Sequence, residues 1–331
     1  MTSPKTVQLA FEQFEREIVR VSDADNADAK SVHPAIRDHL KQELPTVGDF
    51  LSGSYGRKTK TSPLKDVDLI LILDDPDGRL RASAKDGLER VRSALVGSTL
   101  VERTRLGVRA VKGQLHDYDF HFDVVPALES ERGEQLWLPR HLPDEGLDDW
   151  TLEHPRGQLN AAIDRNAETS GFYIRLIRAM KFWNGSVESN RLSSYHVEAI
   201  AHRAITEKLS WPEAVVAWFE QAYDVLAPGV VLPDPGHSTR DVLERLDADK
   251  RARRRNRVER ARDLARTAAE ADDLNEALRA WGKVFGPAFP MSDADRKAAE
   301  RALRTGDKLA LGVLGAAAVG AVIKSRSWRP A

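Results

Sequence analysis

The chain has 331 residues, contains no cysteine and carries a formal net charge of −1 at pH 7. The lack of cysteine excludes disulfides and thiolate zinc sites, and the near-zero charge excludes a global field that attracts nucleic acid or an anionic membrane. Apolar residues make up 41% and charged residues 31%, which is typical of a soluble globular protein with one large domain or two lobes. The N-terminus shows no signal-peptide pattern, so we expect a cytoplasmic protein that does not bind membranes.

The first half of the chain is predicted to alternate helices and strands. Apolar residues at helical spacing predict a helix over residues 7–20, and the polar segment 23–30 is predicted to be a turn. The elements predicted next are a helix at 32–44, a strand at 47–51, a strand that follows an acidic pair and ends at 73, a helix at 84–95, a strand at 100–112 with a turn at Gly113, and a strand at 120–125. This order indicates a mixed α/β lobe.

The second half is predicted to be helical. Residues 128–155 are rich in proline, glycine and acids, and we interpret them as the crossing between two lobes. The helices predicted beyond them cover residues 160–166, 172–183, 194–209, 212–226, 239–266 and 273–285. The expected fold is therefore α+β and bilobal, with an α/β lobe at 1–150, a helical lobe at 151–305 and an apolar, basic tail at 306–331.

A glycine-serine pair followed by two alternating aspartates forms the first candidate site. Asp66 and Asp68 are two residues apart at the start of a strand, so both carboxylates point the same way. Two crowded carboxylates are unfavourable unless a cation lies between them, and Mg²⁺ prefers such oxygen ligands, usually shared with substrate phosphates. Gly53 lets the backbone approach a phosphate closely, and Ser54 is expected to hold the β and γ phosphates of a donor. The pattern indicates phosphoryl or nucleotidyl transfer from a nucleoside triphosphate.

A site with two metal ions usually needs a third carboxylate. The strand at 120–125 supplies Asp123, which we predict to be this ligand, with Asp119 as the reserve. Asp-x-Asp before a strand is common by chance and a lone Gly-Ser pair is an ordinary turn, but their combination with Asp123 favours metal binding. Arg57 and Lys58 could add positive charge near the phosphates or could lie on a solvated face.

These motifs resemble a known family. The segments GSYGRKT, DVDL and FDVVPA, at 53–59, 66–69 and 122–127, look like the polymerase-β-type nucleotidyltransferase pattern. The segments KFWN, LSSYHVE and WGKVFGPAFP, at 181–184, 192–198 and 281–290, resemble the cyclic GMP-AMP synthase-like enzymes, which include the bacterial CD-NTases of cyclic-oligonucleotide anti-phage defence (CBASS). The resemblance consists of scattered motifs between residues 35 and 290.

The resemblance implies a polymerase-β-like lobe with a mixed sheet and a helical lobe that closes over the cleft. It further implies that Lys181 and Ser194 contact the triphosphate and that Tyr195 stacks on the nucleobase. The sequence alone favours a surface lysine for Lys181 and a helix cap for Ser194. His196 is expected to be structural. The tryptophans expected in the core are Trp183, Trp211, Trp218 and Trp281.

The implied activity is the synthesis of a cyclic di- or oligonucleotide messenger from NTPs, ATP among them, with two Mg²⁺ ions for which Mn²⁺ can substitute. A ribose hydroxyl of one nucleotide attacks the α-phosphate of another, and pyrophosphate leaves. Asp66 and Asp68 would bridge both ions, and Asp123 would bind the ion that activates the hydroxyl. The alternatives are a template-independent RNA-tailing enzyme, a transferase that modifies a protein or a drug, and a catalytically inactive nucleotide-binding scaffold.

Two segments are candidate partner surfaces. The run at 250–262 holds eight basic residues and could contact nucleic acid, although a solvated helix face is the simpler interpretation. The apolar segment at 309–323 is shorter than the ~20 residues that span a bilayer, and the resemblance makes this tail a candidate site for a CBASS regulatory protein. The zinc-binding insertion of the animal DNA-sensing enzyme needs cysteines, so stable binding of double-stranded DNA is not expected.

Overall fold

The computed structural model of the protein describes residues 5–187 and 189–305. Contacts divide the chain into two compact units. The sheet unit is the continuous segment Val21–Ile163, and the helical unit combines the chain up to Arg20 with the chain from Asp164 onward. The expected α+β class is confirmed. The expected boundary after residue 150 differs from this division, because the first helix belongs to the helical unit and the sheet unit ends inside helix α5 (Pro155–Glu168).

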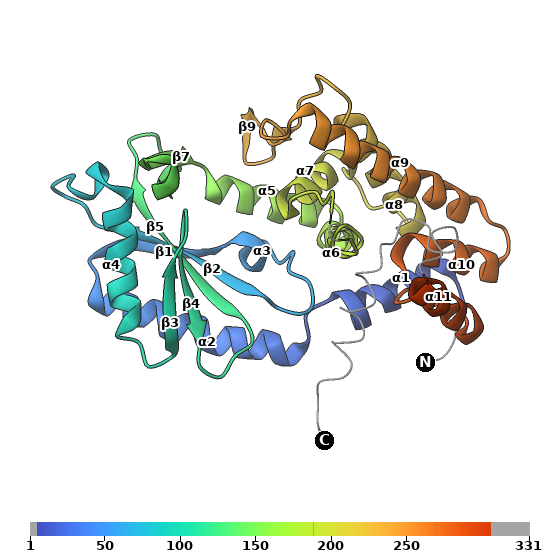
Figure 1. Cartoon of the computed structure of the whole chain (residues 1–331), viewed down its shortest axis with the longest axis horizontal. Coiled ribbons are helices and arrows are strands. Elements are labelled where there is room, and N and C mark those ends of the chain that lie inside the picture. The colour runs from blue at the N-terminus through green and yellow to red at the C-terminus, as the bar shows by residue number, and fades with distance from the viewer. Residues whose placement is uncertain (1–4, 188, 306–331) are drawn as a thin grey trace. The chain divides into compact units, whose positions relative to one another are not determined.

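Seven strands form the main sheet of the sheet unit (Figure 1). In chain order they are β1 (Thr46–Ser52), β2 (Asp66–Leu73), β3 (Val101–Leu106), β4 (Val111–Leu115), β5 (His121–Glu129), β6 (Leu136–Leu142) and β7 (Leu147–Glu153). Their spatial order is β1-β2-β5-β4-β3, with β6 beside β5 and β7 beside β6. Strands β2 and β5 are parallel, and the other neighbouring pairs are antiparallel. The two strands expected to carry the aspartates are therefore direct neighbours.

Two neighbouring rows of side chains run across the sheet, and they lie on its opposite faces. Residues directly opposite each other on adjacent strands share a face, and the next row points to the other face. One row consists of Leu51, Leu69, Val124, Val111 and Leu106. The next, which we call the polar row, consists of Ser52, Asp68, Asp123, Lys112 and Arg105.

Two helices cover the apolar face of the sheet. Helix α2 (Asp23–Glu43) contributes Val32, Ile36 and Leu40 to the core, and helix α4 (Ala84–Val96) contributes Leu88, Val91 and Leu95. These side chains belong to the same buried cluster as the centre of the apolar row. The apolar row is buried against these helices. The polar row is the next row in the strand register, so it lies on the opposite face of the sheet.

Three predictions for this unit are wrong. Residues 23–30 form the start of α2 and not a turn, because Ser22 Oγ accepts a hydrogen bond from the Asp25 N–H as an N-cap. The expected strand at 100–112 is the hairpin of β3 and β4, and Gly113 lies inside β4 and not in a turn. The segment 128–155, expected to cross between lobes, forms β6 and β7 instead. Leu136 is buried in a cluster with Ile70, and Trp150 lies in the main core.

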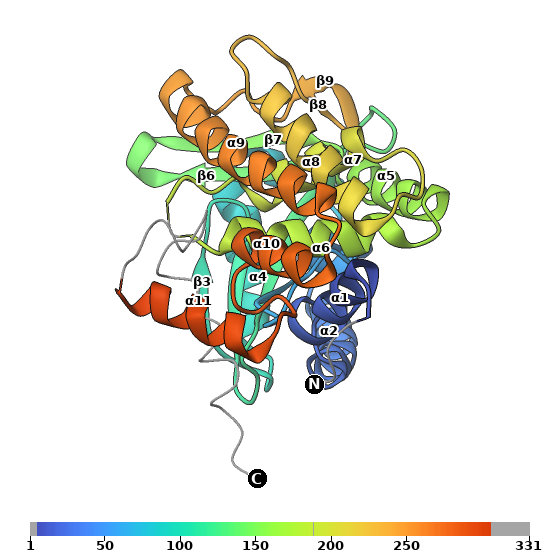
Figure 2. The same ribbon diagram turned by 90° about the vertical axis from the view of Figure 1, so that its right-hand side faces the viewer.

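The helical unit begins with α1 (Val7–Phe14), which continues as a π-helical turn (Glu15–Val19). Its other elements are α6 (Phe172–Gly185), α7 (Ser194–Ala204), α8 (Trp211–Val225), β8 (Pro233–Asp234), β9 (His237–Asp241), α9 (Ala248–Glu270), α10 (Leu274–Phe285) and α11 (Asp293–Thr305). Figure 2 shows α8 and α9 side by side, with α10 next to α9. The helical character predicted for this region is confirmed. The helix expected at 239–266 begins only at Ala248, because Asp247 is its N-cap and residues 237–241 form β9.

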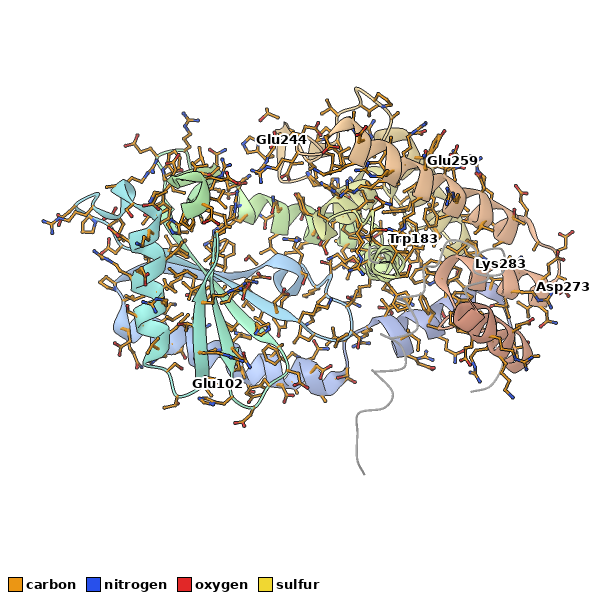
Figure 3. The ribbon with its side chains drawn as sticks, in the orientation of Figure 1. Glu102, Trp183, Glu244, Glu259, Asp273 and Lys283 are labelled. Carbon is orange, nitrogen blue, oxygen red and sulfur yellow. The ribbon has the colours of Figure 1, made fainter. Side chains whose placement is uncertain are left out.

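An aromatic core ties α1 to the C-terminal helices. The ring of Phe11 lies 5.3 Å from that of Trp211 and 4.9 Å from that of Trp281, and it also contacts Phe285 and Phe289. All four predicted core tryptophans are fully buried. Trp183 lies among the helices in Figure 3, whereas the labelled Asp273 and Lys283 lie on the outside.

The basic run on α9 binds backbone carbonyls of its own unit. Arg257 donates to Trp183 O at 2.8 Å and stacks over the Trp183 ring, and burial lowers the pKa of this guanidinium to about 10. Arg254 donates to Arg191 O, and Arg255 donates to Tyr223 O near the end of α8. These arginines therefore stabilise the ends of neighbouring segments, where helix carbonyls lack intrahelical donors.

No helix in the described part of the chain is long and apolar enough to cross a membrane. The tail at 306–331, with its apolar segment at 309–323, lies outside the described residues.

Candidate functional site

Three aspartates gather at one end of strands β2 and β5. Asp68 and Asp123 are direct neighbours in the parallel register, and Asp66 lies two residues earlier on β2, on the same face. Asp123 is only 7% exposed, and Asp66 and Asp68 are partly buried. The structure thus brings the three predicted carboxylates together, whereas Asp119 is exposed and precedes β5.

The cluster is electrostatically unfavourable for its own carboxylates. Burial, and then the neighbouring charges of Asp66 and Asp123, raise the pKa of Asp68 to about 7 although Arg57 opposes the effect. Burial also raises the pKa of Asp123, against the opposing charge of Lys112. A site in which carboxylates retain protons so readily favours a cation in place of those protons.

Gly53 fits closely against this cluster. It follows β1 and opens a short helical turn, α3 (Gly53–Gly56), with a left-handed φ of +58°. A Cβ at this position would collide with the carboxylate of Asp68. The predicted phosphate cradle of Gly53 and Ser54 therefore lies directly beside the acidic pair, and only glycine fits at its first position.

The residues present suit a hard cation. Asp123 Oδ1 is buried and accepts no hydrogen bond from the described residues. Its other oxygen, Oδ2, lies 3.2 Å from Lys112 Nζ. Within 5–187 and 189–305, no three histidine or acidic side chains already stand in a metal-binding arrangement. The donor chemistry nevertheless fits, since Mg²⁺ takes carboxylate oxygens and Asp123 offers one that is buried and unsatisfied.

Lys181 occupies a different environment from the one that its sequence context favours. Its Nζ donates to Glu198 Oε1 at 2.6 Å, and the side chains of Lys181 and Glu198 are 8% and 3% exposed. Lys181 on α6 is therefore held by a buried ion pair to α7 and is not a surface lysine. Sequence reasoning missed Glu198, although a single acid inside the apolar stretch VEAIA was a signal for a buried partner.

Two adjacent serines, Ser193 and Ser194, lie at the N-terminus of α7, and only one of them caps the helix. Ser193, and not Ser194, is the cap: its Oγ accepts from His196 N–H, and His196 Nδ1 accepts from Ser193 N–H. His196 Nε2 also lies 3.1 Å from Val242 O. The structural role expected for His196 is confirmed, and the cap expected at Ser194 is wrong by one residue.

Tyr195 is anchored by a residue that sequence reasoning missed. Its hydroxyl donates to Asp234 Oδ1, and Gly236 N–H donates to the same oxygen at 2.8 Å. Asp234 is 3% exposed and lies in the small hairpin of β8 and β9. No local signal links positions 195 and 234, because the contact joins elements far apart in the sequence.

Comparison with known proteins finds relatives that are nucleotide second-messenger synthases. Residues 5–166 match the Second Messenger Oligonucleotide or Dinucleotide Synthetase (SMODS) domain. The chain is 28% identical over 299 residues to a cyclic AMP-AMP-AMP synthase of Acinetobacter sp., and the match covers 82% of either protein. It is 26% identical to a cyclic AMP-AMP-GMP synthase of Enterobacter hormaechei, over 86% of this chain and 92% of that protein. These matches confirm the expected resemblance to the bacterial CD-NTases.

Solved structures share the fold of this chain. Escherichia coli CdnC in complex with HORMA-deltaN matches with a TM-score of 0.70 and 17% identity, over 85% of this chain and 98% of CdnC. Vibrio cholerae DncV, a cyclic AMP-GMP synthase bound to a linear intermediate, matches with a TM-score of 0.66 and 12% identity, over 89% and 98%. The expected family is confirmed, and with it the class of activity: a nucleotidyltransferase that makes a cyclic oligonucleotide messenger.

Proposed function

We propose that this protein joins NTPs into a cyclic di- or oligonucleotide at the site formed by Asp66, Asp68 and Asp123. The observation that carries the proposal is the neighbouring pair of Asp68 and Asp123 directly beside Gly53, where a Cβ would collide with the Asp68 carboxylate. Three carboxylates on one face, one with a buried unsatisfied oxygen, suit two divalent cations.

The site residues of the sheet unit would bind the metal ions and the donor phosphates. Asp66 and Asp68 would hold two Mg²⁺ ions, or Mn²⁺, and Asp123 would hold one of them. Bound Mg²⁺ neutralises phosphate charge and lowers the pKa of the attacking ribose hydroxyl. Ser54 and the backbone at Gly53 would hold the β and γ phosphates of the donor. Arg57, whose charge opposes the rise in the pKa of Asp68, would add positive charge beside these phosphates.

The helical unit would contribute the remaining substrate contacts. We assign Lys181 and Ser194 to the triphosphate and Tyr195 to the nucleobase. The contacts of these residues support the assignment. Lys181 is held by Glu198, and the Tyr195 hydroxyl is held by Asp234. Ser193 caps the helix, so the side chain of Ser194 is not needed for capping. A ring fixed through its hydroxyl loses little further freedom when a base stacks on it.

ATP is the first substrate to test, because the two curated relatives described above are named as synthases of adenine-containing products. We place the reaction in the cytoplasm, where NTPs are available, as a step of CBASS signalling. CdnC is described in complex with a HORMA protein, and a regulator of that kind, bound through the tail at 306–331, is proposed for this chain.

The test is incubation of the purified protein with labelled ATP, GTP, CTP and UTP plus Mg²⁺ or Mn²⁺, followed by phosphatase. A phosphatase-resistant product is expected, since cyclisation leaves no terminal phosphate, and mass spectrometry would name its bases. Asp66→Ala/Asp68→Ala should abolish it. Asp119→Asn removes a nearby exposed carboxylate outside the cluster and should leave the product unchanged.

Two results would contradict the proposal. A product that survives in the double aspartate variant would mean that these residues are not the site. Labelled product that forms only with added RNA, and stays sensitive to phosphatase, would indicate an RNA-tailing enzyme.

A further inference from the structure

The polar row places a lysine next to the most buried carboxylate of the site. Lys112 lies on β4 directly opposite Asp123, and Arg105 lies opposite Lys112 on β3. In this row, acidic residues thus occupy the neighbouring strands β2 and β5, and basic residues occupy the next two strands, β4 and β3. Oppositely charged residues directly across a sheet attract each other.

The contact between Lys112 and Asp123 is direct. Lys112 Nζ lies 3.2 Å from Asp123 Oδ2, while Asp123 Oδ1 accepts no hydrogen bond from the described residues. The lysine side chain is 47% exposed and the aspartate side chain 10%. The ammonium group can therefore leave the carboxylate toward solvent, whereas the carboxylate stays where it is.

We infer that Lys112 is a built-in counter-cation, which pairs with Asp123 in the metal-free protein and gives up this oxygen when a divalent ion binds. The inference rests on the proposed function, because it needs Asp123 to be a metal ligand. Lys112 stabilises the apo site by offsetting the repulsion among its carboxylates. It thereby weakens metal binding until a substrate triphosphate brings further ligands to the ion.

The exposure of Lys112 sets the size of the effect. Pairs that involve a solvent-exposed partner contribute only modestly, so removing the lysine should tighten metal binding about two- to fivefold. The same change should lower the melting temperature of the metal-free protein, since Asp123 then lacks its ion-pair partner.

The experiment is a titration of the nucleotide-free full chain with Mn²⁺, with free Mn²⁺ followed by electron paramagnetic resonance. Lys112→Met keeps the length of the side chain and removes the charge, and a two- to fivefold lower Kd for Mn²⁺ is expected. Arg105→Met is the matched control, because it removes an exposed charge from the same row one strand further from Asp123. Its Kd should equal that of the wild type. In an Asp123→Asn background, Lys112→Met should leave the Kd unchanged.

A second measurement uses melting temperatures with EDTA and with Mn²⁺. Lys112→Met should melt below the wild type in EDTA and gain more from Mn²⁺. Equal or weaker Mn²⁺ binding by Lys112→Met, or an equal gain in Arg105→Met, would overturn the role of Lys112. If Asp68→Asn still loses Mn²⁺ binding, the metal site itself stands. Absence of Mn²⁺ binding in wild type and Lys112→Met alike would contradict both proposals.

Discussion

Asp68 shows how a single residue is held at a cost to the folded protein. Its pKa is raised from 3.8 to about 7, first by burial and then by its acidic neighbours. In the metal-free protein, Asp68 therefore binds a proton more tightly when the chain is folded than when it is unfolded. The corresponding contribution to the free energy of unfolding is fully present in acid and is lost as the pH rises through about 7.

Asp68→Asn should stabilise the metal-free protein at pH 8 while it abolishes synthesis. Asparagine carries no charge at any pH, so the variant avoids the cost of the buried carboxylate. Thermal unfolding in EDTA should show a higher melting temperature than the wild type at pH 8 and a smaller difference at pH 5. Asp119→Asn controls for a general change in net charge. A melting temperature of Asp68→Asn at or below the wild type at pH 8 would contradict this account.

Gly53→Ala should impair both stability and synthesis, because the methyl group meets the Asp68 carboxylate. Gly146→Ala is a matched control: Gly146 has a similar φ of +66°, but nothing lies within 4 Å of an added Cβ. Both variants incur about 1–2 kcal/mol of left-handed backbone strain. Only Gly53→Ala should also lose cyclic product in the phosphatase assay. Equal activity of the two variants would show that the close contact with Asp68 has no catalytic role.

At the level of elements, the start of α7 separates stability from substrate binding in two adjacent residues. Ser193→Ala removes the cap and should lower the free energy of unfolding by about 1 kcal/mol. Ser194→Ala leaves the cap intact, so it should raise the KM for NTP at nearly unchanged melting temperature. Urea denaturation and initial rates would measure both. If Ser194→Ala lowers stability and leaves KM unchanged, its assigned contact with the triphosphate is wrong.

The elements also show which parts of the site the sequence could predict. β2 and β5 are short apolar runs with acids at fixed parity, so their strand character and the shared face of Asp66 and Asp68 follow from local pattern. β6 was missed because Pro139 and the acids around it resemble a loop, although Pro139 is accommodated opposite Trp150. Partners such as Lys112 and Asp234 depend on strand register and on distant contacts, which no local pattern encodes.

At the level of the whole molecule, the sequence of the sheet unit is inserted into the sequence of the helical unit. The sheet unit is continuous, while the helical unit is completed by α1 from the start of the chain. The π-helical turn after α1 adds a charged link to the same unit, since Glu15 pairs with Arg178 at 2.9 Å. Stability of the helical unit should therefore depend on residues that precede the sheet unit.

Phe11→Ala should destabilise the helical unit and leave the sheet unit intact. The phenylalanine is fully buried among four aromatic rings, so its truncation should cost about 3–5 kcal/mol. Leu9→Ala on the same helix is the control, because Leu9 is 46% exposed. Hydrogen exchange should accelerate in α8 and α10 but not in β2 or β5. Equal acceleration in both units would show that they unfold as one.

The insertion of one unit into the other also affects how the protein is made. Ribosomes synthesise about 5–20 residues per second, so roughly 15–50 s pass between the appearance of Phe11 and that of Trp281. During this interval the sheet unit emerges in full, while the set of rings that buries Phe11, which runs from Trp211 to Phe289, is still incomplete. The apolar face of α1 thus stays incompletely covered until Phe289 has been made, and we expect a ribosome-associated chaperone to bind α1 during this time.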